Sequence, residues 1–332
     1  MVAQLDNAPT GTQFSFLHRM DSVAGEAVEV VTDRRRLGDA SFLDGRETFW
    51  RQQALVPLRL GERDRPLADR FIFHVGFAGS TLLARLLHRH GQVLALKEPQ
   101  SLADIAGQRA AIVAGKGIAP LGTLLDHALA ELACAGDDDV ALVVKPTNWV
   151  NLLLPELCAP FRVRHAVFVT MDRRAYLRAC FRGGRDRLAF CTRLASGIAP
   201  VLPRGNDLLR AAIAAGDDPL DRAARIVALL HWMQESLFRD VIARRGWPDA
   251  VLVRFEDLLA DPVATVADVQ HQLALPDLPV DADHVARLMT RHTKDPSYSF
   301  QRSGRADQDR EVDSHHAARF DAAIGWLEHA TA

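Results

Sequence analysis

The sequence predicts an α/β fold in three layers, with a central parallel sheet flanked by helices and further helical insertions. Short, continuous apolar runs alternate along the chain with longer segments of helical periodicity. Unbroken apolar runs are typical of strands buried on both faces, and strands that alternate with helices favour a parallel sheet. The runs cover residues 71–76, 93–96, 140–144, 165–169 and 250–253.

The rest of the chain is arranged around these strands. Residues 1–69 are predicted to be an N-terminal extension packed on the core, with a helix near 46–54. Residues 70–305 are predicted to form the main domain, and residues 306–332 a C-terminal tail or helix. Helices are expected over 82–87, 101–135, from about 173, and near 207–215, 219–245 and 262–274.

The composition is that of an ordinary globular protein, with 332 residues, of which 48% are hydrophobic and 25% charged. A net charge of −2 does not indicate binding to nucleic acid or to an anionic membrane surface. The four cysteines form no C-x-x-C pair, which favours a reducing cytoplasm. We expect no signal peptide and no stable membrane insertion, since no apolar run approaches the ~18 residues that span a bilayer. The oligomeric state is left open.

The turn after the first strand has the composition of an anion-binding loop. Gly76 and Gly79 let the backbone approach an anion closely, and the hydroxyls of Ser80 and Thr81 can cap the helix and donate. Backbone N–H groups at a helix N-terminus attract anions. The alternative is a structural turn, because the lysine of the pattern G-x-x-x-x-G-K-[ST] is absent. The candidate binding residues are Phe77, Ala78, Gly79, Ser80, Thr81 and Leu82.

Charged residues follow the next two strands. Lys97 and Glu98 come after the strand at 93–96, and Lys145 comes after the strand at 140–144. The carboxyl ends of parallel strands lie at one edge of a sheet, where ligands bind. We therefore expect these charges beside the loop. The alternatives are that the lysines lie at the surface and that Glu98 is solvated or pairs with Lys97.

Together these motifs resemble those of the sulfotransferase family, particularly its divergent bacterial members, over about residues 70–305. The segment from Phe73 to Leu83 is similar to the family's loop for the 5′-phosphosulfate of PAPS (3′-phosphoadenylyl sulfate). The other similar segments are Lys97-Glu98-Pro99, Lys145-Pro146, Phe255-Glu256-Asp257-Leu258-Leu259-Ala260-Asp261-Pro262 and Phe300-Gln301-Arg302-Ser303-Gly304-Arg305.

The resemblance implies a P-loop-like α/β fold and transfer of a sulfuryl group from PAPS to a hydroxyl or amine of a small-molecule, lipid or glycan acceptor, with no metal required. Glu98 is the expected general base, and Lys145 or Lys97 the cation beside the departing phosphate. Arg173 or Arg174 is expected to make a bidentate contact with a phosphate. The residues expected at the 3′-phosphate are Arg302, Ser303, Gly304 and Arg305. The segment 255–262 is expected to be structural, with Asp257 or Asp261 turning the chain into the next helix.

Three positions depart from the family pattern. Phe77 stands where the family usually places Lys or Arg, and Met171 and Cys180 stand at the usual Arg and Ser after the 3′-phosphate strand. Two alternatives therefore stay open. One is another P-loop phosphotransferase such as a kinase, which needs a loop lysine and a Mg²⁺-binding carboxylate. The other is a degenerate, non-catalytic nucleotide-binding or scaffold protein.

Two further patterns involve arginines and histidines. A row of arginines at spacings of four, four and three shares one helical face, either solvated or turned toward a phosphate. These are Arg174, Arg178, Arg182 and Arg185. Two histidine pairs lack further ligands at metal-binding spacing, so no metal site is predicted. They are His88 with His90 and His315 with His316.

Overall fold

The computed structural model describes residues 12–61, 65–137, 139–159, 161–216, 218–289 and 302–332, with side chains in the last range from residue 307 onward. A five-stranded parallel sheet, in the order β5-β6-β4-β7-β8, forms its centre. The predicted α/β fold with a central parallel sheet is confirmed. The strands are β4 (Arg70–His74), β5 (Val93–Lys97), β6 (Ala141–Lys145), β7 (His165–Thr170) and β8 (Leu252–Arg254).

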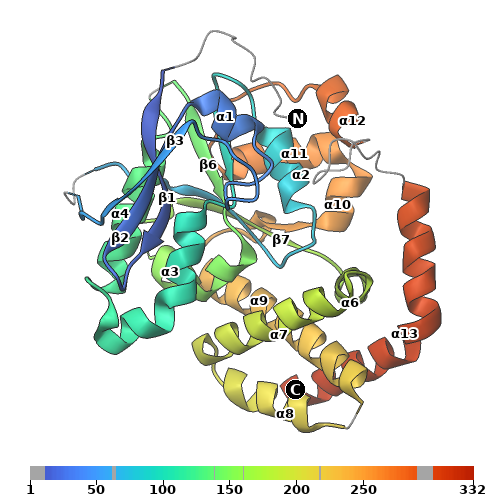
Figure 1. The fold of residues 1–332 in the computed structure, drawn as a ribbon. Coiled ribbons are helices and arrows are strands. Elements are labelled where there is room, and N and C mark those ends of the chain that lie inside the picture. The colour runs from blue at the N-terminus through green and yellow to red at the C-terminus, as the bar shows by residue number, and fades with distance from the viewer. Residues whose placement is uncertain (1–11, 62–64, 138, 160, 217, 290–301) are drawn as a thin grey trace, which may run out of the picture.

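Helices flank this sheet (Figure 1). α2 (Ser80–Leu87) and α11 (Pro262–Gln272) contact each other beside one face. α9 (Pro219–Arg245) lies beside the other face, where Phe238 contacts Phe168 of β7 with ring centroids 5.0 Å apart. The other helices described are α1 (Arg34–Asp39), α3 (Gln100–Ala111), α4 (Leu121–Ala133), α5 (Leu154–Leu157), α6 (Arg173–Arg182), α7 (Gly184–Ile198), α8 (Gly205–Ala214), α10 (Phe255–Ala260), α12 (Ala282–Met289) and α13 (Arg302–Thr331). Of the helices in the described ranges, none has the length and apolar character needed to cross a bilayer.

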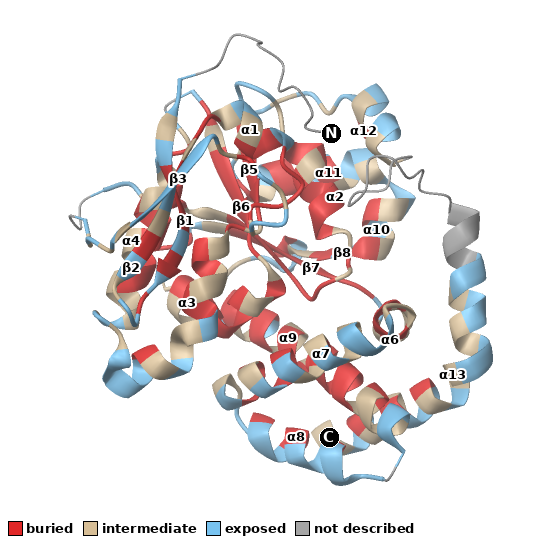
Figure 2. Cartoon of the chain, in the orientation of Figure 1, coloured by how far each residue is buried: buried red, intermediate tan, exposed pale blue. Residues whose placement is uncertain are grey.

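The apolar runs form the core because the sheet is covered on both faces. All of β5 is buried, and in β4, β6 and β7 only the first residue is half-buried, so the strands form the buried centre of Figure 2. Phe73 of β4 stacks on both Phe71 and Phe168, with ring centroids 5.4 Å away in each case. Burial of one such side chain contributes about 1.5–3 kcal/mol.

The N-terminal residues form a second, antiparallel sheet in the order β1-β2-β3. Its strands are β1 (Phe14–Asp21), β2 (Glu26–Thr32) and β3 (Gln52–Pro57). β1 packs on α3, where the N–H of Met20 donates to Asp104 Oδ2 at 3.1 Å. The prediction of a helix near 46–54 is wrong. Instead, residues 52–57 form the strand β3, which pairs with the edge of β2 that β1 does not occupy. Phe49 and Trp50, just before β3 begins, pack against His18.

The C-terminal segment, predicted as a tail or helix, is the helix α13, and it runs beside α6 (Figure 1). Three arginines of α6 form ion pairs with three aspartates of α13, so this part of the predicted arginine row shares a face and meets acidic side chains. Arg185, the fourth residue of the row, belongs to α7 instead. Each pair is partly exposed and contributes about 0–1 kcal/mol. We call these contacts the arginine–aspartate ladder. They are Arg174 with Asp321, Arg178 with Asp313 and Arg182 with Asp309.

Candidate active site

The loop between β4 and α2 turns back through left-handed backbone conformations. Gly76, Phe77 and Gly79 have φ values of 92°, 58° and 72°. Glycine adopts such angles at little cost, whereas Phe77 does so only with strain. The helix α2 begins directly afterwards at Ser80, so its first N–H groups and the hydroxyls of Ser80 and Thr81 lie at the end of the central strand. This is the arrangement that binds anions at helix N-termini.

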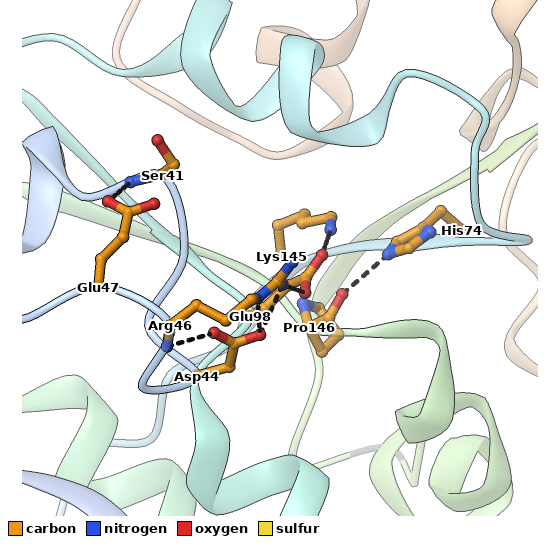
Figure 3. A network of polar contacts seen from close by, with 8 residues as sticks. All are labelled: Ser41, Asp44, Arg46, Glu47, His74, Glu98, Lys145 and Pro146. Atoms are coloured by element: carbon orange, nitrogen blue, oxygen red, sulfur yellow. Dashed lines mark hydrogen bonds and ion pairs between the residues drawn. The ribbon is translucent and has the colours of Figure 1, made fainter. Parts of the chain in front are cut away.

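Buried polar side chains fix the loop. The N–H of Gly76 donates to Nδ1 of His74 at 3.0 Å, so the hydrogen of this ring is on Nε2, which donates to the carbonyl of Pro146 at 2.9 Å (Figure 3). Asn148 Nδ2 and Gln234 Nε2 both donate to the carbonyl of Val75, at 3.1 and 3.0 Å. These contacts satisfy buried donors and acceptors on both sides of the loop, which makes the loop rigid.

Phe255 packs against the other side of the loop. A Cβ added at Gly79 would lie 2.3 Å from Cε2 of this ring, so only glycine fits there. The segment 255–262 is therefore structural, as expected, and its first residue supports the loop directly. The carboxylate of Asp261 accepts from the N–H of Ala264 at 3.0 Å and caps α11. Of the two aspartates proposed to turn the chain, Asp261 makes the cap.

One cavity of about 990 Å³ brings the loop together with the charges at the strand ends. Glu98 and Lys145 border it, as do the loop residues from Gly79 to Leu82. Small, aromatic and charged residues from other elements also border the cavity. They are Ala103 and Gly107 of α3, Trp149 of the 3₁₀ helix η2 (Asn148–Leu153), and Arg187 and Phe190 of α7.

Glu98 lies between two cations (Figure 3). Lys145 Nζ is 2.5 Å from Oε1, and the guanidinium of Arg46 is 2.9 Å from Oε2. Lys145 is 1% exposed, whereas Arg46 is 53% exposed and rests on the ring of Phe42. Glu98 itself has φ of 59°, and its N–H donates to the carbonyl of Lys145 at 2.6 Å. The carboxylate is therefore held at the cavity by strained backbone and a buried amine. Nothing in the sequence around Arg46 indicates that this residue contacts Glu98.

Lys97 does not reach this cavity. Its Nζ donates to the carbonyl of Gly38 at 2.6 Å, and the side chain is buried. Burial, together with the charge of Arg85, lowers the pKa of Lys97 to about 8. Of the two lysines predicted beside the departing phosphate, the structure brings only Lys145 to the cavity, and Glu98 pairs with Lys145 instead of Lys97.

We expect Lys97 to make the stability of the fold rise with pH above its folded pKa. Below pH 8 the amine is protonated in both the folded and the unfolded chain, and its contribution is constant. Between pH 8 and 10.5 the unfolded chain binds more protons, so the free energy of unfolding increases. Urea denaturation should show an increase of about 2 kcal/mol between about pH 7.5 and 9.5. Lys97→Met should lack this increase, and an equal increase in that variant would contradict the assignment.

Two of the arginines predicted to contact a phosphate lie away from the cavity. Arg174 belongs to the ladder, and neither it nor Arg173 borders the cavity. Met171 and Cys180, at the family's usual Arg and Ser positions, are buried in the core away from it. The side chains of Arg302, Ser303 and Arg305, and Gly304 with them, fall outside the described side chains. The backbone from residue 302 belongs to helix α13.

No metal site emerges from the part of the chain that is described, where no three His, Cys, Asp or Glu side chains gather closely enough to hold an ion. The histidine pairs do not alter this. His88 contacts His90, with ring centroids 4.9 Å apart, and burial lowers the pKa of His88 to about 3.

No protein-family model matches the sequence, and no curated protein matches it. Among solved structures, the chain is similar to the crystal structure of a sulfotransferase from Alicyclobacillus acidocaldarius. The match has 15% sequence identity and a TM-score of 0.37, and it covers 77% of this chain and 96% of the other. A likeness of this degree carries no information about the reaction.

Proposed function

We propose that this protein is a sulfotransferase that takes a sulfuryl group from PAPS and transfers it to a hydroxyl or amine of a small-molecule, lipid or glycan acceptor. The observation that carries the proposal is the shared cavity of the loop, Glu98 and Lys145. Three of the segments that resemble the sulfotransferase family, 73–83, 97–99 and 145–146, contain these same residues.

The loop has the features that a phosphosulfate needs. A Cβ at Gly76 would lie 2.7 Å from Asn148 Nδ2 and one at Gly79 would meet Phe255, so both glycines let these side chains pack directly against the loop and hold its shape. The N–H groups at the start of α2, the hydroxyls of Ser80 and Thr81, and Lys145 would hold the anionic end of PAPS. PAPS, when bound, supplies the sulfuryl group and a phosphate leaving group. Lys145 then stabilises negative charge that develops on that phosphate.

Glu98 accepts the proton of the acceptor in this proposal. Lys145 stays beside the carboxylate because it is buried, and it balances the negative charge. Arg46 is the more exposed partner, so an acceptor hydroxyl can take its place against Oε2. A positioned general base contributes about 10²- to 10⁴-fold to the rate. The wall of Ala103, Gly107, Trp149 and Phe190 would contact the rest of the acceptor.

Calorimetric titration with PAP (3′-phosphoadenosine 5′-phosphate), beside ADP with Mg²⁺, tests the proposal. We expect PAP to bind and to protect the protein against thermal unfolding, because ligands of the folded state stabilise it. Incubation with PAPS and a panel of phenols, sterols and sugars should then release PAP. Binding of Mg-ADP alone would favour a kinase. Binding of PAP without turnover of any acceptor would favour a non-catalytic binding protein, and binding of neither ligand would overturn the proposal.

A further inference from the structure

Phe77 is uncharged, but a positively charged side chain from another helix lies next to it. We propose that Arg187 of α7 supplies the phosphosulfate-binding cation of the loop and that the ring of Phe77 holds it in place. The proposal rests on the proposed function, and it assigns to the 5′-phosphosulfate group a residue outside every recognised motif.

The contact between the two side chains is direct. Cζ of Arg187 lies 4.6 Å from the centroid of the Phe77 ring, within the ~6 Å range of cation–π attraction. Both residues border the cavity. The Phe77 ring is itself oriented by Tyr176, whose ring centroid lies 6.2 Å away in the buried core. The strained φ of Phe77 thus places an aromatic face, rather than a charge, at the loop position where an anion would bind.

The backbone around Arg187 is shaped to receive its side chain. Its guanidinium donates to the carbonyl of Ala179 at 2.6 Å, in the last turns of α6. A Cβ at Gly183 would lie 2.0 Å from Nε of Arg187, so the arginine passes directly over Gly183, and a larger residue there would displace the arginine side chain. Gly183 has an ordinary φ of −79°, so its effect on Arg187 comes from the space it leaves and not from its backbone conformation. A guanidinium has five N–H donors, more than this one hydrogen bond uses.

The arginine of α6 that borders the same cavity is neutralised by an acid, whereas Arg187 has no such partner among the described side chains. Arg182 also borders the cavity, but it pairs with Asp309 in the ladder. Among the described side chains, no Asp or Glu forms an ion pair with Arg187. The charge of Arg187 is therefore not compensated by a carboxylate on α6, α7 or α13. A planar guanidinium suits two oxygens of a phosphate or sulfate, which a point charge such as lysine does not match as well.

The test compares ligands with and without a 5′-phosphate, because only that group should lie at the loop. We expect Arg187→Met, which keeps an apolar stem over Phe77, to weaken PAP binding about 10- to 100-fold, as loss of a hydrogen bond to a charged group does. Its affinity for adenosine 3′-phosphate should stay at the wild-type value. Arg193→Met, on an exposed position of the same helix away from the cavity, is the matched control and should bind both ligands normally.

A second variant tests the replacement itself. Phe77→Lys combined with Arg187→Met returns a cation to the loop and should recover PAP affinity to within about tenfold of the wild type, since one charge then substitutes for the other. Equal PAP affinity in Arg187→Met and Arg193→Met would overturn the inference while leaving the proposed function intact. An equal loss for both ligands would also overturn it, because a structural role predicts that result. Failure of the wild-type protein to bind PAP would overturn both.

Discussion

Glu98→Gln is expected to lower the rate of sulfuryl transfer about 10²- to 10⁴-fold, the usual contribution of a general base. Glutamine has nearly the same shape but cannot take the acceptor's proton. PAP affinity should remain close to the wild-type value, because the loop and Lys145, rather than Glu98, hold the phosphates. Single-turnover kinetics and calorimetry on the same preparation separate the two effects.

The same substitution removes the partner of a buried amine. Lys145 is 1% exposed, and breaking a buried ion pair by removing one partner costs about 3–5 kcal/mol. The double variant Glu98→Gln with Lys145→Met removes both charges, so denaturation should show that most of the stability returns. Its transfer rate should stay low. A double variant that regains both stability and rate would show that Glu98 is a structural partner of Lys145 and not the base.

Gly79→Ala is expected to abolish PAP binding and to lower the free energy of unfolding by about 2–5 kcal/mol. Two costs combine. An alanine at φ of 72° is strained, by about 1–2 kcal/mol, and its Cβ would lie 2.3 Å from the Phe255 ring, an overlap that costs about 1–3 kcal/mol. The ring and the loop must separate, and the N–H groups at the start of α2 then lose their alignment.

Gly91→Ala is the matched control for this effect. Gly91 has φ of 73°, almost the same as Gly79, but a Cβ there meets no atom within 4 Å. The control therefore carries the backbone strain without the overlap, and it should bind PAP normally. Chemical denaturation and calorimetry on both variants isolate the contribution of Phe255. If the two variants behaved alike, Phe255 would not support the loop.

The strands and the loop could be predicted because each depends on local pattern. Buried parallel strands require unbroken apolar runs, and the ends of such strands meet at one edge, so the sequence alone predicts Glu98 and Lys145 beside the loop. The choice between Lys97 and Lys145 could not be made in this way. Both end a strand, and what separates them is a distant partner, the carbonyl of Gly38 for one and Glu98 for the other.

The positions of Arg46 and Arg187 at the site could not be predicted from the sequence for the same reason. Arg46 lies 52 residues before Glu98, in a segment whose secondary structure was predicted incorrectly, and only the folded N-terminal region brings it to the cavity. The importance of Arg187 depends on Gly183 and on a ring from another element. The arginine spacing on α6 did predict a shared face, but its acidic partners on α13 lie 127 to 147 residues further along.

The ladder gives the two halves of α13 different responses to their surroundings. Near its end, Phe320 is fully buried against Phe181, and apolar contacts of this kind weaken on cooling. The half that includes Asp309 and Asp313 is held to α6 by half-exposed ion pairs, which weaken as the Debye length shrinks from ~10 Å at 0.1 M salt to ~3 Å at 1 M. The third pair of the ladder, Arg174 with Asp321, lies in the second half, where Phe320 adds an apolar contact, so high salt loosens the first half of the helix more than the second. Because Arg182 borders the cavity, ionic strength acts on the wall of the site through a helix that begins far from it in the sequence.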